Sequence, residues 1–583
     1  MTTGQHRDLA SGVPVQDGPG RADLLGALTA LRDAVARVAL PLAAPGVEDA
    51  RRAQRELVGQ LDDYVLPRLW SIDAPLLAVV GGSTGAGKST LVNSLVGRPV
   101  SSASVLRPTT RGPVLVHAPA DERWFTDRRI LPGLARVTGS PDARGGDARS
   151  LHLVADPGLT PGLALLDAPD IDSVVTANRE LAAQLLAAAD LWVFVTTAAR
   201  YADAVPWDLL RDASGRSAAV GVVLDRVPPE AMAEVRDHLA GMLRAQGLGE
   251  APLFVVPETA PSSGLLPPPA VEPVRGWLRE LAGDAQARAV VVRRTLDGVL
   301  DSFRQRVPAL AAAVEGQERA AGRLRSGVVL AYDDAIRAVD EALRGGSLLR
   351  GEVLARWQEF IGTGELLRGL ESRIGQLRDR LTAAVLGRPA PAHQLEVALE
   401  TGVESLIRAE ADRAAERAVT LWRGDAAGAV LLESAPGRLD GASAELPERA
   451  SRLVRDWQQG VLQLVRDQGQ AKRSTARLLS YGVNGAALVV MVAVFAHTGG
   501  LTGGEVAVAG GASALSQKVL EALLGDQAVR DLAAAARADL RTRVASLLDG
   551  ERARFLDLLN TAGVGDVDPA DLIAAQRLVE RSR

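Results

Sequence analysis

A glycine-rich segment, GSTGAGKS at residues 82–89, constrains the fold of this 583-residue chain more than any other feature. It follows the apolar run Leu76–Val80 and precedes a helical pattern, so it is expected to join a strand to a helix. Glycines let a backbone wrap closely around phosphate oxygens, and the loop N–H groups and the helix N-terminus favour an anion there. In this pattern Lys88 reaches the β- and γ-phosphates and the Ser89 hydroxyl ligates Mg²⁺. The segment therefore predicts a nucleotide-binding P-loop.

Short apolar runs alternate with helical patterns from about residue 71 to residue 283. Such alternation is typical of a mostly parallel sheet with helices on both faces, so this region is expected to be an α/β P-loop domain. The expected strands are Leu76–Val80, Val114–Val116, Leu163–Leu166, Leu191–Val195, Val220–Leu224 and Leu253–Val256.

Long amphipathic helices are expected on both sides of this domain. Residues 22–70 read as helices that are interrupted at Pro41 and Pro45 and pack on a bundle. Residues 284–477 show heptad-like apolar spacing, which predicts a helical bundle or stalk with coiled-coil packing. Residues 518–583 are expected to return to that bundle, whereas the Gly- and Pro-rich residues 1–21 are expected to be disordered.

An uncharged segment stands out near the C-terminus. Leu478–Gly504 contains no Asp, Glu, Lys or Arg, and its first part is long enough to cross a bilayer core, which takes about 20 residues. Three basic residues precede it, and the glycine-rich turn TGGLTGG separates it from a shorter apolar stretch, Val506–Leu515. Residues 478–517 therefore predict a membrane-associating hairpin that either spans the bilayer or only inserts into it. A buried Ala- and Gly-rich helix pair is the alternative.

Composition excludes several classes of protein. The chain has no cysteine, which rules out disulfides, zinc–thiolate sites and cysteine nucleophiles. Sixty-six basic and 71 acidic residues give a net charge of −5, so binding of nucleic acid by bulk charge is excluded and no nucleic acid partner is expected. The first residues carry no secretory signal, so a cytoplasmic location is expected.

Three further segments complete the predicted nucleotide site. Thr110, in RPTTR at residues 107–111, follows a loop and precedes an apolar strand, where a threonine can meet the γ-phosphate and Mg²⁺. Asp167 ends an apolar strand, as expected of a carboxylate that holds Mg²⁺ through water. After another strand, Asp225 and Arg226 occupy the position of a base-specificity loop, where the arginine can stack on a base.

These elements, in this order, resemble the dynamin-like branch of GTPases, and bacterial dynamin-like GTPases most of all. The layout is similar too: helices before the GTPase domain, long helices after it, and an apolar hairpin near the C-terminus. The resemblance implies GTP as substrate, Mg²⁺ as cofactor, and nucleotide-driven dimerisation through the GTPase domain or pairing with a paralogous GTPase. It also implies binding or remodelling of an anionic membrane at the inner face of the cell membrane.

The resemblance assigns roles residue by residue. Polar residues just after the first P-loop glycine position the attacking water in this family, so Lys88, Ser83, Thr84 and Thr110 are the expected catalytic residues. The expected metal ligands are Ser89, Thr110 and Asp167. The expected nucleotide-binding residues are Gly82, Ser83, Thr84, Gly85, Ala86, Gly87, Lys88, Ser89, Thr90, Asp170, Asp225 and Arg226.

Two positions depart from the family pattern. Asp170 stands where the family usually has glycine; its backbone N–H could meet the γ-phosphate, but its carboxylate would repel it. Pro228 stands where GTPases carry the aspartate that recognises guanine, so the sequence does not decide between GTP and ATP. Arg107 and Arg111 are candidates for charge stabilisation of the transition state.

Three other interpretations remain open. The loop also fits the GxxGxGKST form of cassette-type ATPases, although no LSGGQ-like signature follows and Ala168 replaces the expected glutamate. The segment from Gly82 to Arg111 also resembles Era- or TrmE-like GTPases that associate with ribosomes or RNA, although no basic RNA-binding module follows. Finally, the chain could be a scaffold that binds nucleotide without hydrolysing it.

Overall fold

In the computed structural model, two compact units can be distinguished. The first comprises Met1–Leu40, Gly46–Glu315 and Gly565–Arg583, and the second comprises Pro41–Pro45 and Gly316–Val564. The structure describes residues 19–101, 112–127, 130–138, 150–171, 176–203, 207, 210–211, 219–344, 391–470 and 526–583.

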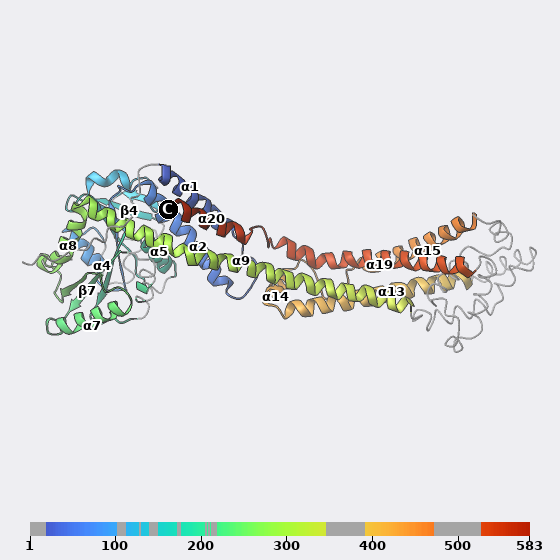
Figure 1. Ribbon diagram of the computed structural model, residues 1–583. Helices are drawn as coiled ribbons and strands as arrows, with labels where there is room; N and C mark the ends of the chain where they lie inside the picture. Colours follow the sequence, from blue (N-terminus) through green and yellow to red (C-terminus); the bar gives the residue numbers. More distant parts are fainter. Residues whose placement is uncertain are drawn as a thin grey trace, which may run out of the picture. The chain divides into compact units, whose positions relative to one another are not determined.

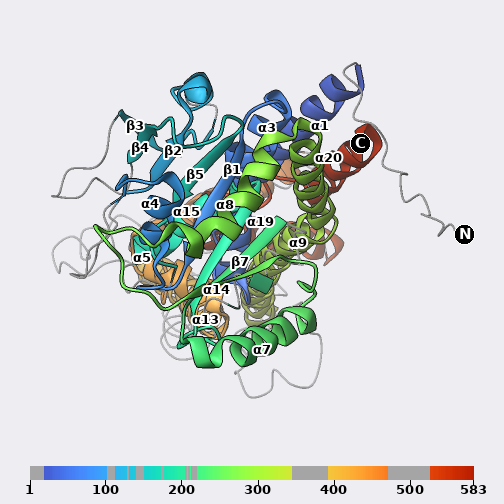
Figure 2. The same ribbon diagram turned by 90° about the vertical axis from the view of Figure 1, so that its left-hand side faces the viewer.

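The described part of the first unit contains an eight-stranded sheet with the order β3-β4-β2-β5-β1-β6-β7-β8 (Figure 2). All neighbouring strands run parallel except β2 and β5, which are antiparallel. The strands are β1 (Leu76–Gly82), β2 (Val114–His117), β3 (Ala135–Thr138), β4 (Ser150–Ala155), β5 (Leu163–Asp167), β6 (Leu191–Thr197), β7 (Ala219–Val227) and β8 (Leu253–Pro257). The expected α/β class with a mostly parallel sheet is confirmed, and each of the six expected strands is present.

Helices cover both faces of this sheet, which explains why its central strands are apolar throughout. All seven residues of β1 are buried, and alternate residues point to opposite faces. Leu76, Ala78 and Val80 pack with helices α4 (Lys88–Val96) and α8 (Pro268–Gly283). Leu77 and Val79 belong to the core on the other face, with helices α5 (Thr176–Ala187) and α7 (Met232–Ala245).

Strands β3 and β4 were not among the expected strands. β3 forms the edge of the sheet, and its four residues are exposed or half-buried, so they carry no continuous apolar run. In β4 the buried His152 interrupts the apolar residues. Neither sequence therefore shows the pattern of a strand that is buried on both faces.

A helical layer completes the first unit. It contains α1 (Pro19–Arg37), α2 (Val47–Gln60), the π-helical turn η1 (Leu61–Val65), α3 (Leu66–Trp70), the part of α9 (Ala285–Arg344) up to Glu315, and α20 (Pro569–Ser582). Figure 1 shows α1 and α20 side by side, so segments near the two ends of the chain pack together. Their shared core includes Leu28, Leu31, Phe303, Val307 and Leu572. The helix break expected at Pro41 and Pro45 lies between α1 and α2.

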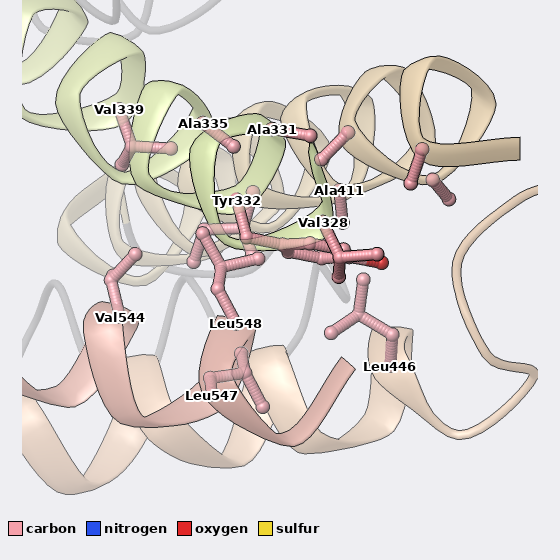
Figure 3. Packing of buried hydrophobic residues seen from close by; sticks show 14 of the residues in the cluster. Val328, Ala331, Tyr332, Ala335, Val339, Ala411, Leu446, Val544, Leu547 and Leu548 are labelled. Atoms are coloured by element: carbon pink, nitrogen blue, oxygen red, sulfur yellow. The ribbon is translucent and has the colours of Figure 1, made fainter. Parts of the chain in front are cut away.

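All the secondary-structure elements in the described part of the second unit are helices. It contains the remainder of α9, α13 (Pro391–Arg423), α14 (Ala426–Glu433), α15 (Leu446–Gln470) and α19 (Asp526–Thr561). In Figure 3, Val328 and Tyr332 of α9 face Leu547 and Leu548 of α19. Two fully buried tryptophans donate hydrogen bonds to backbone carbonyls of neighbouring helices: Trp422 to Leu324 at 3.2 Å and Trp457 to Ala536 at 2.8 Å. The expected large helical region is therefore confirmed.

The predicted membrane hairpin, residues 478–517, lies outside the described residues, as do residues 1–18 of the expected disordered N-terminus. Within the ranges that the structure does describe, no helix combines the length and apolar character needed to cross a bilayer.

Candidate nucleotide-binding site

The P-loop lies between β1 and α4, and glycines are required at both of its ends. The backbone φ angles are 156° at Gly82 and 93° at Gly87, in the region that side chains rarely adopt. A Cβ atom on Gly82 would lie 2.0 Å from the backbone oxygen of Val195 in β6. A Cβ atom on Gly87 would lie 2.4 Å from Oδ2 of Asp225. The loop is thus packed tightly against the ends of two neighbouring strands, as the motif predicts.

Lys88, the first residue of α4, is almost fully buried, with 6% of its surface exposed. Its ammonium group donates to the carbonyl oxygens of Gly82 and Ser83, each at 2.9 Å. A third bond, at 2.5 Å, goes to Oδ1 of Asp170 in the segment after β5. The lysine is therefore fixed inside the loop with a carboxylate at its tip.

Asp167 and Ser89 come together at the base of the loop. The Ser89 hydroxyl donates to Oδ2 of Asp167 at 2.6 Å, and the Ser101 hydroxyl donates to the same oxygen at 2.5 Å. Burial raises the pKa of Asp167, opposed by these two hydrogen bonds and by the charge of Lys88. The register of β1 and β5, which pairs Val80 with Asp167, places this carboxylate next to the loop.

The oxygen atoms of Asp167 and Ser89 are suited to binding a magnesium ion. Oδ1 of Asp167 is buried, and the described residues supply no hydrogen-bond partner for it. A carboxylate and a serine hydroxyl are the hard oxygen ligands that Mg²⁺ prefers, and a buried carboxylate oxygen without a partner is costly unless a cation or a donor joins it. Thr110, the third predicted ligand, lies outside the described residues together with Arg107 and Arg111.

The two residues predicted to position water differ in their surroundings. Ser83 is fully buried, and its hydroxyl has no hydrogen-bond partner in the described part of the chain. Thr84 is half-buried, and Arg200 donates to its carbonyl oxygen. Gly85 is exposed at the tip of the loop with a φ of 75°, while Thr90 is half-buried in α4.

The predicted base-specificity residues lie beside the P-loop. Asp225 is buried at the end of β7, and its Oδ1 accepts a hydrogen bond from the backbone N–H of Arg226 at 2.8 Å. Burial raises the pKa of Asp225, and the Arg226 N–H and charge oppose this. Arg226 has a φ of 54°, a strained conformation for a residue other than glycine, and its side chain is exposed. The pairing of β7 with β8 shifts register between Leu224 and Val227, at the position of this strained residue.

Two residues at the site were missed by sequence reasoning: Ser101, which donates to Asp167, and Arg200, which donates to Thr84. No sequence pattern marks Ser101. A signal for Arg200 does exist, because it follows β6, a predicted strand, and the carboxyl ends of neighbouring parallel strands gather where ligands bind.

No family model matches the chain, and no curated protein matches it. The chain is similar to several solved structures. One of them belongs to "an oligomerised bacterial dynamin pair", which is described as providing a mechanism for the long-range sensing and tethering of membranes. That match has 11% identity, covers 98% of this chain and 95% of the other, and has a TM-score of 0.40. LeoA, a bacterial dynamin GTPase from ETEC, matches at 12% identity over 96% of this chain and 97% of its own, with a TM-score of 0.25.

Era from Aquifex aeolicus, bound to GDP and aluminium fluoride, matches at 20% identity with a TM-score of 0.23. That alignment covers 36% of this chain and 56% of the Era chain, so this chain spans little more than half of Era. Both of these bacterial dynamins are matched over nearly the whole of this chain. At these identities and TM-scores the likeness does not extend to what this chain binds or does.

Proposed function

We propose that the chain is a magnesium-dependent nucleoside triphosphatase with GTP as its preferred substrate. The observation that carries this proposal is the convergence of Lys88, Ser89 and Asp167 around one glycine-rich loop, with Oδ1 of Asp167 buried and unpaired within the described residues. A lysine held by loop carbonyls and a serine–aspartate pair below it provide a cation for phosphate oxygens and ligands for a metal ion.

The roles of the residues follow from their positions. The loop N–H groups and the N-terminus of α4 hold the phosphates, and Lys88 balances the charge of the terminal ones. Ser89 and Asp167 would hold Mg²⁺, which would neutralise negative charge on the phosphates during the reaction. Water attacks the γ-phosphorus, the bond to the bridging oxygen breaks, and the nucleoside diphosphate and phosphate leave. No protein nucleophile is required, because positioning and electrostatics supply the catalysis.

The preference for guanine rests on the order of the motifs, since Pro228 replaces the residue that would recognise the base. The exposed guanidinium of Arg226 can stack on either purine. GTP and ATP therefore have to be compared directly.

We also propose that nucleotide hydrolysis by this chain is coupled to membrane binding. The support is the uncharged run Leu478–Gly504 with basic residues before it, which is suited to insertion into an anionic bilayer. We further propose that two nucleotide domains, from identical or paralogous chains, pair when nucleotide is bound, at the inner face of the cell membrane.

A second candidate function is nucleotide binding without turnover. The Lys88–Asp170 pair favours it, because a lysine neutralised by a carboxylate contributes less positive charge to the transition state at the terminal phosphate.

The test is binding and turnover of GTP beside ATP by the full chain, with Mg²⁺ or with a chelator, and with or without anionic liposomes. Lys88→Ala removes the proposed phosphate contact, and Arg236→Ala, which removes an exposed cation from α7, is the matched control. Mg²⁺-dependent GTP turnover that Lys88→Ala abolishes and liposomes stimulate is the expected result. ATP preference would contradict the GTPase assignment, tight binding without turnover would select the scaffold function, and unchanged activity of Lys88→Ala would refute the site itself.

A further inference from the structure

An arginine outside every predicted motif reaches the P-loop. Arg200 lies on the turn after β6, where its backbone N–H bonds to the carbonyl oxygen of Thr197 at 3.0 Å. Its Nη1 donates to the carbonyl oxygen of Thr84 at 2.9 Å, across 116 positions of sequence. Strand β6 pairs with β1 in parallel, which brings the turn after β6 to the end of β1 where the P-loop begins.

Arg200 and Lys88 hold consecutive peptide units of the loop. Lys88 bonds to the carbonyl oxygens of Gly82 and Ser83, and Arg200 bonds to the next one, that of Thr84. Two full positive charges are thus attached to three successive carbonyl groups. Since Lys88 is the residue that meets the β- and γ-phosphates in this motif, a second cation one peptide unit further along lies at the same end of the nucleotide.

Arg200 differs from Lys88 in its exposure to solvent. Its side chain is 39% exposed, in contrast to the buried Lys88. Its Nε donates to Oδ2 of Asp203 at 2.8 Å, a pair three residues apart that is open to solvent on both sides. Such an exposed pair contributes little to stability, about 0–1 kcal/mol.

We propose that Arg200 is a catalytic residue of this site, which rests on the proposed triphosphatase function and deepens it. Arg200 supplies a second positive charge, from the same chain, to the terminal phosphate as its bond to the bridging oxygen breaks. The electron pair of that bond stays on the diphosphate and Arg200 exchanges no proton, so its contribution is electrostatic. A guanidinium suits this role because it is always charged and its planar fork matches phosphate oxygens.

The alternative is that Arg200 only braces the loop through Thr84. Arg200→Gln separates the two roles, because glutamine retains an N–H donor for the carbonyl oxygen but carries no charge. Arg200→Lys retains the positive charge but loses the planar guanidinium group with its paired N–H donors. Arg236→Gln, which neutralises an exposed arginine paired with Asp237 on α7 of the same unit, is the control.

The experiment measures kcat and KM of the full chain with GTP and with ATP, and the affinity for the diphosphate alone and with aluminium fluoride. For Arg200→Gln, kcat is expected to fall about 1,000-fold, the lower end of what a catalytic arginine contributes. Affinity for the diphosphate alone should stay within about three-fold of wild type, which is under 0.7 kcal/mol. The aluminium fluoride complex should be lost, Arg200→Lys should be intermediate, and Arg236→Gln should resemble wild type.

Two results would overturn the assignment of Arg200 alone. The first is wild-type turnover by Arg200→Gln. The second is a loss of diphosphate affinity as large as the loss of turnover, which would indicate that Arg200 only stabilises the loop through Thr84. A wild-type chain that hydrolyses neither nucleotide would instead overturn the triphosphatase function and the arginine's role together.

Discussion

Replacing Asp170 by asparagine should tighten the binding of nucleoside triphosphates. In the structure, its carboxylate lies 2.5 Å from the ammonium of Lys88, the group that a terminal phosphate needs. A triphosphate has to separate this pair and then sits next to the displaced carboxylate. Asparagine is nearly the same size and can still accept a hydrogen bond from Lys88, but it is neutral. The substitution therefore removes the ionic competition and retains the shape.

The size of the effect follows from the charges and their exposure. Two unit charges about 4 Å apart interact by about 4 kcal/mol at the effective dielectric of a protein surface. The Asp170 side chain is 26% exposed and Lys88 only 6%, so solvent screens the pair in part. We therefore expect about 1.5–2.5 kcal/mol, which is roughly a 10- to 70-fold gain in triphosphate affinity. The diphosphate lacks the group that displaces Asp170, so its affinity should change less than about three-fold.

The assay is a titration of the full chain with fluorescent GTP and GDP analogues in the presence of Mg²⁺. The quantity that matters is the ratio of the two dissociation constants, because a general disturbance of the loop alters both. Asp237→Asn, which removes an exposed carboxylate paired with Arg236, is the control and should leave the ratio unchanged. A ratio unaltered by Asp170→Asn, or weaker GTP binding, would show that the carboxylate does not compete with the terminal phosphate.

Three other substitutions test the remaining contacts. Because the folded pKa of Asp167 is raised, its ionised form costs stability once the pH rises above about 4, where the unfolded chain already ionises. Asp167→Asn should therefore raise the ligand-free unfolding temperature at pH 8, more than at pH 5, and abolish Mg²⁺-dependent turnover. Gly87→Ala places a Cβ 2.4 Å from Asp225 at a φ of 93° and should weaken nucleotide binding at least about 10-fold in the same titration. Trp457→Ala removes a fully buried side chain and its bond to Ala536; we expect about 3–5 kcal/mol less stability by urea denaturation, with nucleotide affinity in native buffer retained.

The sheet and the base of the site could be predicted because their signals are local. A strand covered on both faces has to be apolar throughout, as β1 is, so its sequence alone reveals it. The P-loop residues from Gly82 to Ser89 are consecutive, and Asp167 ends an apolar strand. In the structure, parallel pairing of β1 with β5 then brings Asp167 to Ser89. A strand whose residues are exposed or half-buried, such as β3, has no continuous apolar run and therefore cannot be recognised in this way.

The charges around the loop could not be predicted in the same way. The sequence indicated that the Asp170 carboxylate would repel a phosphate, but it did not indicate the ion pair with Lys88, 82 positions away in sequence. Arg200 lies even further from the loop along the chain. Such contacts depend on which way a side chain points after the strands are assembled, and neither apolar periodicity nor motif spacing contains that information.

In the proposed site, the charges of Asp170 and Arg200 act in opposite senses on the terminal phosphate. Asp170 neutralises Lys88 before nucleotide arrives, whereas Arg200 adds a positive charge beside Thr84. If both predictions hold, Asp170→Asn should raise triphosphate affinity without raising kcat, and Arg200→Gln should lower kcat without lowering diphosphate affinity. The double variant then distinguishes separate roles from a shared one: independent contributions to binding and to catalysis should add within about 0.5 kcal/mol, whereas a larger deviation would show that Asp170 and Arg200 act on one another.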